Sequence, residues 1–340
     1  MEQRDLGKTG LRVSALGYGA GAIGGLMVRG DPAEQTRAVA RALEAGVTYF
    51  DTAPSYGDGR SEENLGRALR ELGAWERVVV GTKVRLGPAD LARPGAANAA
   101  IRRSAEQSLR RLGRDAVDLL QLHNPIRLGQ PDPAATTVAS GSAVSLGYAV
   151  GEIAEGLRAL VRDGLARHLG FTGLGEPPAL LEAVHTGPFE TVQAYYNALN
   201  PSAGHPGASG GAQDFAGLIG HAAQAGLGVI AIRVLAAGAL SLQPARHANA
   251  GDPGTPLAPG ADYDHDLQRA RTIARLADEL GLEGPLELAL RFALAQPGLS
   301  TALVGYSDLA QLEAALRWAA RGPLPPDAVD RVVELAQSQV

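Results

Sequence analysis

The chain has 340 residues, of which 45% are hydrophobic and 20% charged, and a formal net charge of −5 at pH 7. This composition is typical of a globular protein and gives no reason to expect nucleic acid or an anionic membrane surface as a partner. Cysteine is absent, which excludes disulfides and thiolate chemistry. No apolar run approaches ~20 residues, and residues 1–5 show no signal-peptide pattern. From these three observations we expect a cytoplasmic protein.

Short apolar runs alternate with amphipathic stretches along the chain. The runs predict strands at 13–19, 47–51, 78–83, 117–123, 167–173, 191–197, 228–234 and 300–305. The amphipathic stretches predict helices near 32–45, 61–72, 97–112, 150–163, 178–185, 212–225, 267–280, 285–295, 308–320 and 326–338. Asp31 and Pro32 mark the start of the first helix, since aspartate is a preferred cap and proline suits the first helical position. A hairpin around residues 8–10 precedes the first strand.

Alternation of strands and helices predicts parallel strands joined by right-handed crossovers. Eight such units fit a (β/α)₈ barrel, with residues 1–340 forming a single domain and the N-terminal hairpin capping the barrel floor. The connections after strands include long loops at 124–149, 198–211 and 235–266, whereas those after helices are short. Because long loops are usually functional, we expect the active site at the C-terminal face of the barrel, where these loops emerge.

The segment "GAGAIG" at residues 19–24 offers an alternative fold. It satisfies the G-x-G-x-x-G pattern of a Rossmann dinucleotide site after a predicted strand, with Asp51 at the end of the next strand. That motif should open a helix, but here the helix is predicted only from residue 31. A Rossmann dehydrogenase therefore remains the second choice.

Reactive side chains stand at the ends of three consecutive predicted strands. The second strand provides Asp51 and then Tyr56, the third ends on Lys83, and the fourth ends on His123. In a barrel these ends meet on one rim, so we expect the four side chains to share a site. Taken singly, each has an ordinary explanation: a polar turn, a solvated lysine or a structural histidine.

Together the four residues suit proton transfer beside a carbonyl group. A neighbouring ammonium favours the phenolate form of a tyrosine, and a carboxylate limits the cost of burying that ammonium. A histidine can orient the carbonyl oxygen. Lysine is used only twice in this chain, at Lys8 and Lys83, against 31 basic residues in all, which indicates that Lys83 has a role arginine cannot fill. No His and acid spacing indicates a metal site.

Several segments resemble the aldo-keto reductase superfamily over nearly the whole chain. They read "RDLGKTGLRVSALGYG", "FDTAPSYGDGRSEENLGRAL", "VVVGTKV", "DLLQLHNP", "HLGFTG", "VQAYYNALN" and "LVGYSDLAQLEAAL". The resemblance implies a (β/α)₈ barrel that binds nicotinamide cofactor across its C-terminal rim. It also implies a catalytic tetrad of Asp51, Tyr56, Lys83 and His123, with Tyr56 as general acid or base and with Asn124 beside Tyr56 and His123 in the substrate site.

The resemblance further implies a set of cofactor contacts. Gln193 corresponds to the family's amide-binding glutamine, Thr172 and Gly173 replace a Ser-Asn pair, and Ile232 replaces an aromatic residue that stacks on nicotinamide. Arg233 should lie near the pyrophosphate, and the uncharged Gly305, Ser307 and Gln311 indicate NAD or dual specificity, because they offer no cation to a 2′-phosphate. The expected contacts are completed by Gly19, Ala20, Gly21, Asp51, Leu235 and Gly238.

The resulting prediction is an NAD(P)-dependent oxidoreductase of carbonyl groups, alcohols or sugar lactols. The uncharged loop and the "FTG" segment are similar to sugar dehydrogenases that use NAD. The alternative is a redox-sensing regulatory subunit that binds the cofactor but turns over slowly. The physiological substrate, the reaction direction and the oligomeric state do not follow from the sequence.

Overall fold

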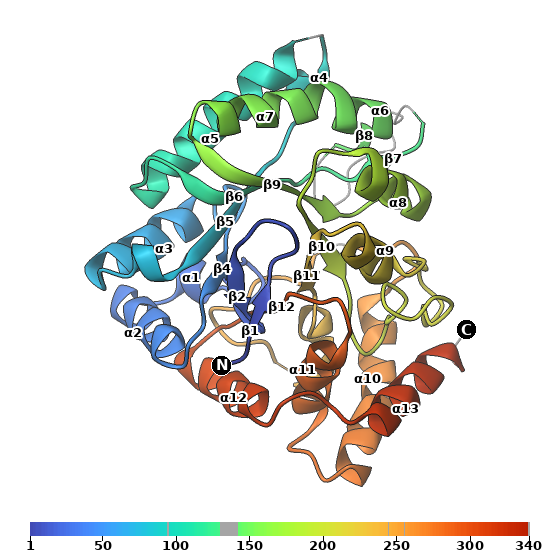
Figure 1. Cartoon of the computed structure of the whole chain (residues 1–340). Helices are drawn as coiled ribbons and strands as arrows, with labels where there is room; N and C mark the ends of the chain where they lie inside the picture. The colour runs from blue at the N-terminus through green and yellow to red at the C-terminus, as the bar shows by residue number, and fades with distance from the viewer. Residues whose placement is uncertain (94, 130–141, 244, 255, 339–340) are drawn as a thin grey trace.

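The structure is a computed structural model, and it describes residues 1–93, 95–129, 142–243, 245–254 and 256–338. Eight parallel strands close into a barrel surrounded by helices (Figure 1). The order around the barrel is β3 (Leu16–Gly19), β4 (Tyr49–Asp51), β5 (Val79–Val84), β6 (Val117–Leu122), β9 (Ala166–Gly173), β10 (Thr191–Tyr195), β11 (Gly228–Ile232) and β12 (Thr301–Gly305), which pairs again with β3. The predicted (β/α)₈ barrel is confirmed and the Rossmann alternative is wrong.

Helices follow the strands and cover the outside of the barrel (Figure 1). The longer ones are α2 (Pro32–Glu44), α3 (Arg60–Glu71), α5 (Ala96–Leu112), α7 (Ala154–Arg162), α8 (Pro177–Thr186), α9 (Leu218–Gln224), α10 (Tyr263–Glu279), α11 (Pro285–Ala295), α12 (Leu309–Ala320) and α13 (Pro326–Gln337). The predicted start of α2 is confirmed, because the Asp31 side chain accepts hydrogen bonds from the backbone N–H groups of Ala33 and Glu34.

Two predicted helix starts are wrong for local reasons. The helix expected from residue 212 begins at Leu218, because Asp214 accepts from the N–H groups of Ala216 and Gly207 and holds a turn there. The helix expected from residue 267 begins at Tyr263, because the Asp262 side chain caps its first turn. In both cases a side chain outside the apolar pattern decides where the helix starts.

The sequence did not predict the short elements of the loops. These are α1 (Leu26–Arg29), α4 (Pro88–Leu91), α6 (Leu146–Tyr148), the strands β7 (Ile126–Arg127) and β8 (Val144–Ser145), a π-helical turn at Ala149–Ile153, and 3₁₀ turns at Trp75–Arg77 and Ala236–Ser241. Residues 130–141 of the long predicted loop 124–149 lie outside the described residues.

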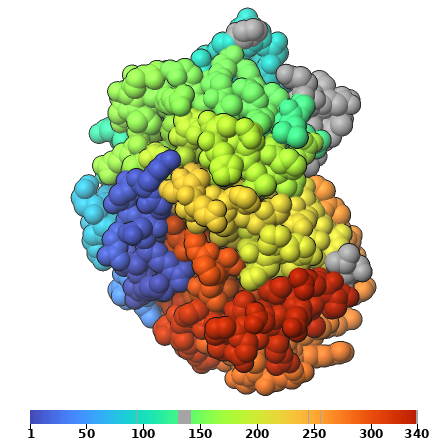
Figure 2. All heavy atoms as spheres, turned by 45° about the vertical axis from the view of Figure 1, so that its right-hand side comes forward, coloured from blue at the N-terminus to red at the C-terminus, as the bar shows by residue number. Residues whose placement is uncertain are grey.

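The predicted hairpin is confirmed and closes the N-terminal end of the barrel. Strands β1 (Gln3–Asp5) and β2 (Arg12–Ser14) are antiparallel, and the N–H of Lys8 donates to Gly226 O at 2.9 Å. The hairpin lies against the yellow segment around Gly226 (Figure 2). Buried Leu6 and Val13 pack with the lower interior side chains of the barrel, namely Tyr49, Val79, Leu119, Ile230 and Leu303. Water is thereby excluded from the floor, and any site must open at the other end.

Candidate active site

The structure brings the four predicted catalytic residues together at the C-terminal end of the barrel. Asp51 is the last residue of β4, Lys83 lies near the end of β5, and His123 directly follows β6. Lys83 Nζ forms an ion pair with Asp51 and lies 3.2 Å from Tyr56 Oη. The Tyr56 and His123 rings stand edge to face with centroids 6.2 Å apart. A phenol, an ammonium and an imidazole are therefore within reach of one substrate atom.

The ammonium of Lys83 is buried but paired. The Lys83 and Asp51 side chains are 1% and 5% exposed, and Nζ also donates to Thr52 O at 2.9 Å. Burial by itself lowers the pKa of Lys83, but the charge of Asp51 and the hydrogen bonds to Asp51 and Tyr56 outweigh it, so that the pKa is raised above its usual value. Lys83 therefore carries a positive charge beside the Tyr56 hydroxyl throughout the neutral pH range.

His123 is neutral in this site. Burial, followed by the positive charges of Lys83 and Arg85, lowers the pKa of His123 well below its ordinary value. Its Nδ1 atom is buried without a hydrogen-bond partner in the described part of the chain. A neutral imidazole has one N–H to donate, so His123 can orient a carbonyl oxygen without becoming an acid.

A polar cluster that the sequence analysis missed surrounds the second oxygen of Asp51. Oδ2 accepts from Gln193 Nε2 at 2.6 Å, Gln121 Nε2 at 3.2 Å and Tyr49 Oη at 3.5 Å, while Oδ1 binds Lys83. The signal was present in "VDLLQLH", because a polar residue inside an otherwise apolar buried strand needs a partner. Of the three donors, only Gln193 was singled out, as a cofactor contact.

The turn that carries Tyr56 depends on backbone conformations that favour glycine. Gly57, Asp58 and Gly59 have φ of 65°, 54° and 89°, and a Cβ on Gly57 would lie 2.3 Å from Val28 Cγ1. The turn is then fastened by α3, where Ser61 Oγ donates to Ala20 O at 2.7 Å and bonds Thr52 Oγ1 at 2.8 Å. The segment before α3 thus fixes the position of Tyr56 over Lys83.

Behind β5, a second buried group holds α3 against the barrel. The fully buried Glu62 accepts from Thr82 Oγ1 and from Arg111 Nε, both at 2.6 Å. Thr82 is the neighbour of Lys83 on β5, and Arg111 lies on α5. The Glu62 carboxylate therefore ties three elements together directly beside the lysine.

The predicted cofactor residues of the first strand lie beside the tetrad. Gly19 ends β3 in register with Asp51, and the N–H of Ala20 donates to Asp51 O at 2.9 Å. A Cβ on Gly21 would contact the Tyr56 ring at 3.9 Å, so glycine leaves space over that ring. Gly21 therefore lies directly beside the phenol ring.

Thr172 and Gly173 end β9 next to Gln193 on β10. A Cβ on Gly173 would lie 2.8 Å from Gln193 O, so only glycine permits this strand spacing. The Thr172 hydroxyl is buried without a hydrogen-bond partner among the described residues. An unpartnered buried hydroxyl at a strand end is a free polar contact for a ligand.

Ile232 and Arg233 lie at the end of β11, followed by a loop with unusual backbone conformations. Arg233, Ala236, Ala237 and Gly238 all have positive φ, and Leu235 packs on the core. Burial lowers the pKa of Arg233, whose Nη1 donates to Pro253 O at 3.5 Å. No carboxylate in the described part of the chain pairs with it. Within the described residues, Arg233 is therefore a cation at the rim without a counter-ion.

The loop after β12 lies against two other loops. Gly24 sits so close that a Cβ would be 2.5 Å from Tyr306 N, and Asn249 Nδ2 donates to Ser307 O at 3.0 Å. Gly305 is exposed, whereas the N–H of Ser307 donates to Gln311 Oε1 at 2.9 Å. The structure thus assembles residues 19–25, 249–251 and 305–311 along one side of the rim.

Carboxylates already occupy the N-terminus of α12. Asp308 accepts from the N–H of Gln311 at 2.8 Å, and Glu34 accepts from the N–H of Leu309 at 3.1 Å. The helix end that attracts anions is therefore capped by two acids. This arrangement was not predicted, because Glu34 comes from α2, far away in the sequence.

Asn124 is turned into the loops rather than toward the tetrad. Its amide accepts from the N–H of Leu86 at 2.9 Å and donates to Leu86 O and Ser142 O at 2.8 and 2.7 Å. These bonds tie the loop after β5 to the loop after β6. Asn124 thus shapes the rim next to His123, and the structure gives it no contact with Tyr56.

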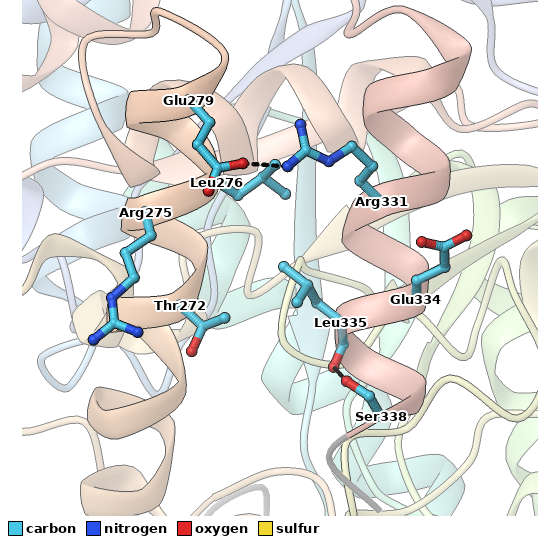
Figure 3. A pocket seen from close by; sticks show the side chains of 8 residues that line it. All are labelled: Thr272, Arg275, Leu276, Glu279, Arg331, Glu334, Leu335 and Ser338. Atoms are coloured by element: carbon cyan, nitrogen blue, oxygen red, sulfur yellow. Dashed lines mark hydrogen bonds and ion pairs between the residues drawn. The ribbon is translucent and has the colours of Figure 1, made fainter.

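Away from the strand ends, a groove of about 340 Å³ lies between α10 and α13 (Figure 3). Glu279 and Arg331 form an ion pair across it, and Arg275 points outward. It contains none of the predicted site residues. Among the described residues, no group of three His, Cys, Asp or Glu could hold a metal ion, and no helix is long and apolar enough to cross a membrane.

Barrel and site together define a class of enzyme, an oxidoreductase of the (β/α)₈ type with a tyrosine beside a buried lysine. Residues 15–337 match the model of the Aldo/keto reductase family. The chain belongs to this family, as the resemblance of its motifs predicted. It is an oxidoreductase that acts on carbonyl or CH–OH groups.

Two relatives agree with this assignment, and a solved structure agrees with the fold. The chain is 30% identical to L-galactose dehydrogenase of Arabidopsis thaliana, over 92% of this chain and 86% of that protein. It is 28% identical to L-glyceraldehyde 3-phosphate reductase of Escherichia coli O157:H7, again over 92% of this chain and 86% of that protein. The fold matches the holo form of aldo-keto reductase AKR11C1 from Bacillus halodurans with a TM-score of 0.72, at 24% identity over 100% of this chain and 98% of that one.

Proposed function

We propose that the protein transfers hydride between a nicotinamide cofactor and a carbonyl carbon, or the corresponding alcohol or sugar lactol, with Tyr56 as the general acid or base. The observation that carries this proposal is the 3.2 Å contact between Tyr56 Oη and the buried ammonium of Lys83. An unperturbed phenol with a pKa near ~10 is a poor acid at neutral pH. A cation at hydrogen-bonding distance stabilises the phenolate that remains once the proton has left.

In the direction of reduction, Tyr56 Oη donates its proton to the carbonyl oxygen of the substrate. The resulting phenolate is stabilised by Lys83, whose charge is in turn balanced by Asp51. In the direction of oxidation the same oxygen accepts the proton of the alcohol or lactol hydroxyl. His123, held neutral, donates its N–H to the substrate oxygen and orients it toward Tyr56.

The residues around the tetrad fit a nicotinamide cofactor, a type of cofactor that this family generally uses. When bound, it would supply or accept the hydride. The unpartnered Thr172 hydroxyl and the Gln193 amide would hold its carboxamide, and Ile232 would pack on its ring. Arg233, a rim cation without a counter-ion, would bind the pyrophosphate together with the backbone of Leu235 and Gly238. Gly19, Ala20 and Gly21 would line the opposite side.

We further propose NAD or dual cofactor specificity. Gly305, Ser307 and Gln311 offer no cation to a 2′-phosphate. The neighbouring N-terminus of α12 carries Asp308 and Glu34, which would repel that phosphate but can accept a hydrogen bond from a ribose hydroxyl. Electrostatics on this side of the rim therefore favour the unphosphorylated cofactor.

Sugar lactols are the preferred substrate class. The relatives named above act, by their names, on a sugar and on a sugar phosphate. Gly21 leaves open space over the Tyr56 ring, which suits a sugar ring better than a closed pocket would. We place this activity in the cytoplasm, consistent with the absence of cysteine.

The test is the initial rate of oxidation of a panel of aldoses with NAD⁺ and NADP⁺ in parallel, together with cofactor binding measured by fluorescence. Faster oxidation with NAD⁺ on at least one aldose supports the proposal. Reduction of simple aldehydes with NADPH only would contradict the assignment of sugars and NAD. Tight cofactor binding without turnover of any sugar or aldehyde would contradict the enzyme and favour the redox-sensing regulatory subunit.

A further inference from the structure

The Asp51 carboxylate has two differently occupied oxygens. Oδ1 binds the ammonium of Lys83, whereas Oδ2 accepts only from neutral donors, the amides of Gln193 and Gln121 and the hydroxyl of Tyr49. A carboxylate can rotate about its Cβ–Cγ bond and exchange its oxygens unless both are bound. The donors on Oδ2 therefore decide which way the other oxygen points.

Of these donors, Gln121 lies entirely inside the barrel. It is fully buried on β6, in register with Lys83 on β5 and with Gly170 on β9. A Cβ on Gly170 would lie 3.1 Å from Gln121 Cγ, and one on Gly81 would lie 3.3 Å from Gln121 Nε2 and 2.7 Å from Tyr49 Oη. Glycine at these two interior positions makes the room that Gln121 and Tyr49 use to reach Asp51.

Burying this amide is costly, because its oxygen has no partner. Gln121 Oε1 is buried without a hydrogen bond among the described residues. A leucine at this position would remove that unsatisfied group. If the role of the side chain were only to fill the interior, an apolar residue would be better suited. The amide N–H bond to Asp51 is what distinguishes glutamine from such a residue.

We propose that Gln121 is a positioning residue of the active site: its amide holds Oδ2 of Asp51 so that Oδ1 faces Lys83 and Lys83 presents its charge to Tyr56. This inference rests on the proposed function for its effect on catalysis. Gln193 binds the same oxygen, but it lies on β10 beside Thr172, where it would also touch a cofactor. Gln121 acts only through Asp51, so its loss should change turnover without changing cofactor binding.

The first variant is Gln121→Leu, measured by steady-state kinetics on the substrate that the aldose panel identifies. We expect kcat to fall by about tenfold or more, the worth of a hydrogen bond to a charged group, with KM and cofactor Kd within about twofold of wild type. Wild-type kcat in Gln121→Leu would overturn the proposal. A loss confined to cofactor Kd would also overturn it.

The second variant, Gln121→Glu, separates positioning from packing. Its carboxyl group can donate to Asp51 when protonated but repels Asp51 when ionised, and burial beside another carboxylate raises the pKa of such a group above the usual ~4.3. We expect Gln121→Glu to have a higher kcat than Gln121→Leu at about pH 5. This expectation does not depend on whether the difference persists at about pH 8. Equal kcat in the two variants at about pH 5 would overturn the proposal. If Gln121→Leu does not fold, Gln121→Glu is compared with wild type at about pH 5 alone: a kcat within about twofold of wild type is expected, and a loss of about tenfold or more would overturn the proposal.

Thr301→Val is the matched control. Thr301 is also fully buried on a barrel strand, but its hydroxyl has no hydrogen-bond partner among the described residues, Asp51 included. The chain offers a second readout that needs no turnover, because lysine labelled with ¹³C gives signals from Lys8 and Lys83 alone. We expect the Lys83 Cε signal to move in Gln121→Leu and to stay in Thr301→Val, with the signal of exposed Lys8 unchanged in both. An unmoved Lys83 signal in Gln121→Leu would overturn the proposal even if the wild-type protein oxidised no sugar, so the two failures are distinguishable.

Discussion

Replacing Lys83 with methionine isolates the energetic role of the buried ion pair. The Lys83 and Asp51 side chains are 1% and 5% exposed, so the variant leaves a carboxylate in the barrel with neutral donors only. Breaking a buried pair by removing one partner typically costs about 3–5 kcal/mol, because the remaining charge is uncompensated. We expect a loss of this size in the free energy of unfolding, measured by reversible denaturation at unchanged m-value.

Two further variants complete this experiment. Asp51→Asn combined with Lys83→Met removes the uncompensated charge and should recover at least about 1 kcal/mol relative to Lys83→Met alone. Lys8→Met is the control, because Lys8 is the other lysine of the chain and is exposed, and it should change stability by no more than about 0.5 kcal/mol. A loss below about 1 kcal/mol in Lys83→Met, or additive effects in the double variant, would refute the account of the pair.

Two other predictions concern pH and helix capping. The pKa of His123 is well below ~6.5 in the folded protein, so as the pH falls the unfolded chain binds a proton at His123 that the native state does not. The free energy of unfolding is therefore at its full value above about pH 6.5 and decreases as the pH drops. His123→Gln should flatten the slope of the unfolding free energy between about pH 7 and 5, and an unchanged slope would count against a neutral His123. Asp31→Ala should lower the free energy of unfolding by about 1 kcal/mol in the same denaturation assay, because Asp31 caps α2 with two hydrogen bonds. Asp31→Asn should keep most of this stabilisation. Equal losses in the two variants would show that the cap is not the cause.

The sequence predicted the barrel because apolar runs and amphipathic stretches alternate regularly along the chain. The barrel strands are near-continuous apolar runs, as expected of strands covered on both faces, and this pattern needs no knowledge of tertiary contacts. The four tetrad residues were found in the same way, because strand ends of a barrel meet on one rim. Both predictions depend only on where strands begin and end along the chain, and this can be read from the sequence directly.

The contacts that support the tetrad depend on register, which the sequence does not state. Gln121 reaches Asp51 only because β6 pairs with β5 so that Gln121 lies opposite Lys83. Glu34 caps α12 across 275 positions of the chain, and the Asn124 amide binds the backbone of Leu86 on the loop after β5. The short loop elements were missed for a related reason, since elements of two to six residues are too short to show a period.

The measurement that tests the central claim most directly is single-turnover hydride transfer in Tyr56→Phe, followed by the absorbance of the reduced cofactor. The variant removes one oxygen atom and keeps the ring that lies over Lys83 and beside His123. We predict that the rate falls on the order of 10²-fold or more while cofactor Kd stays within about twofold. A rate equal to that of the wild-type protein would contradict the assignment of Tyr56 as the acid and base of the reaction.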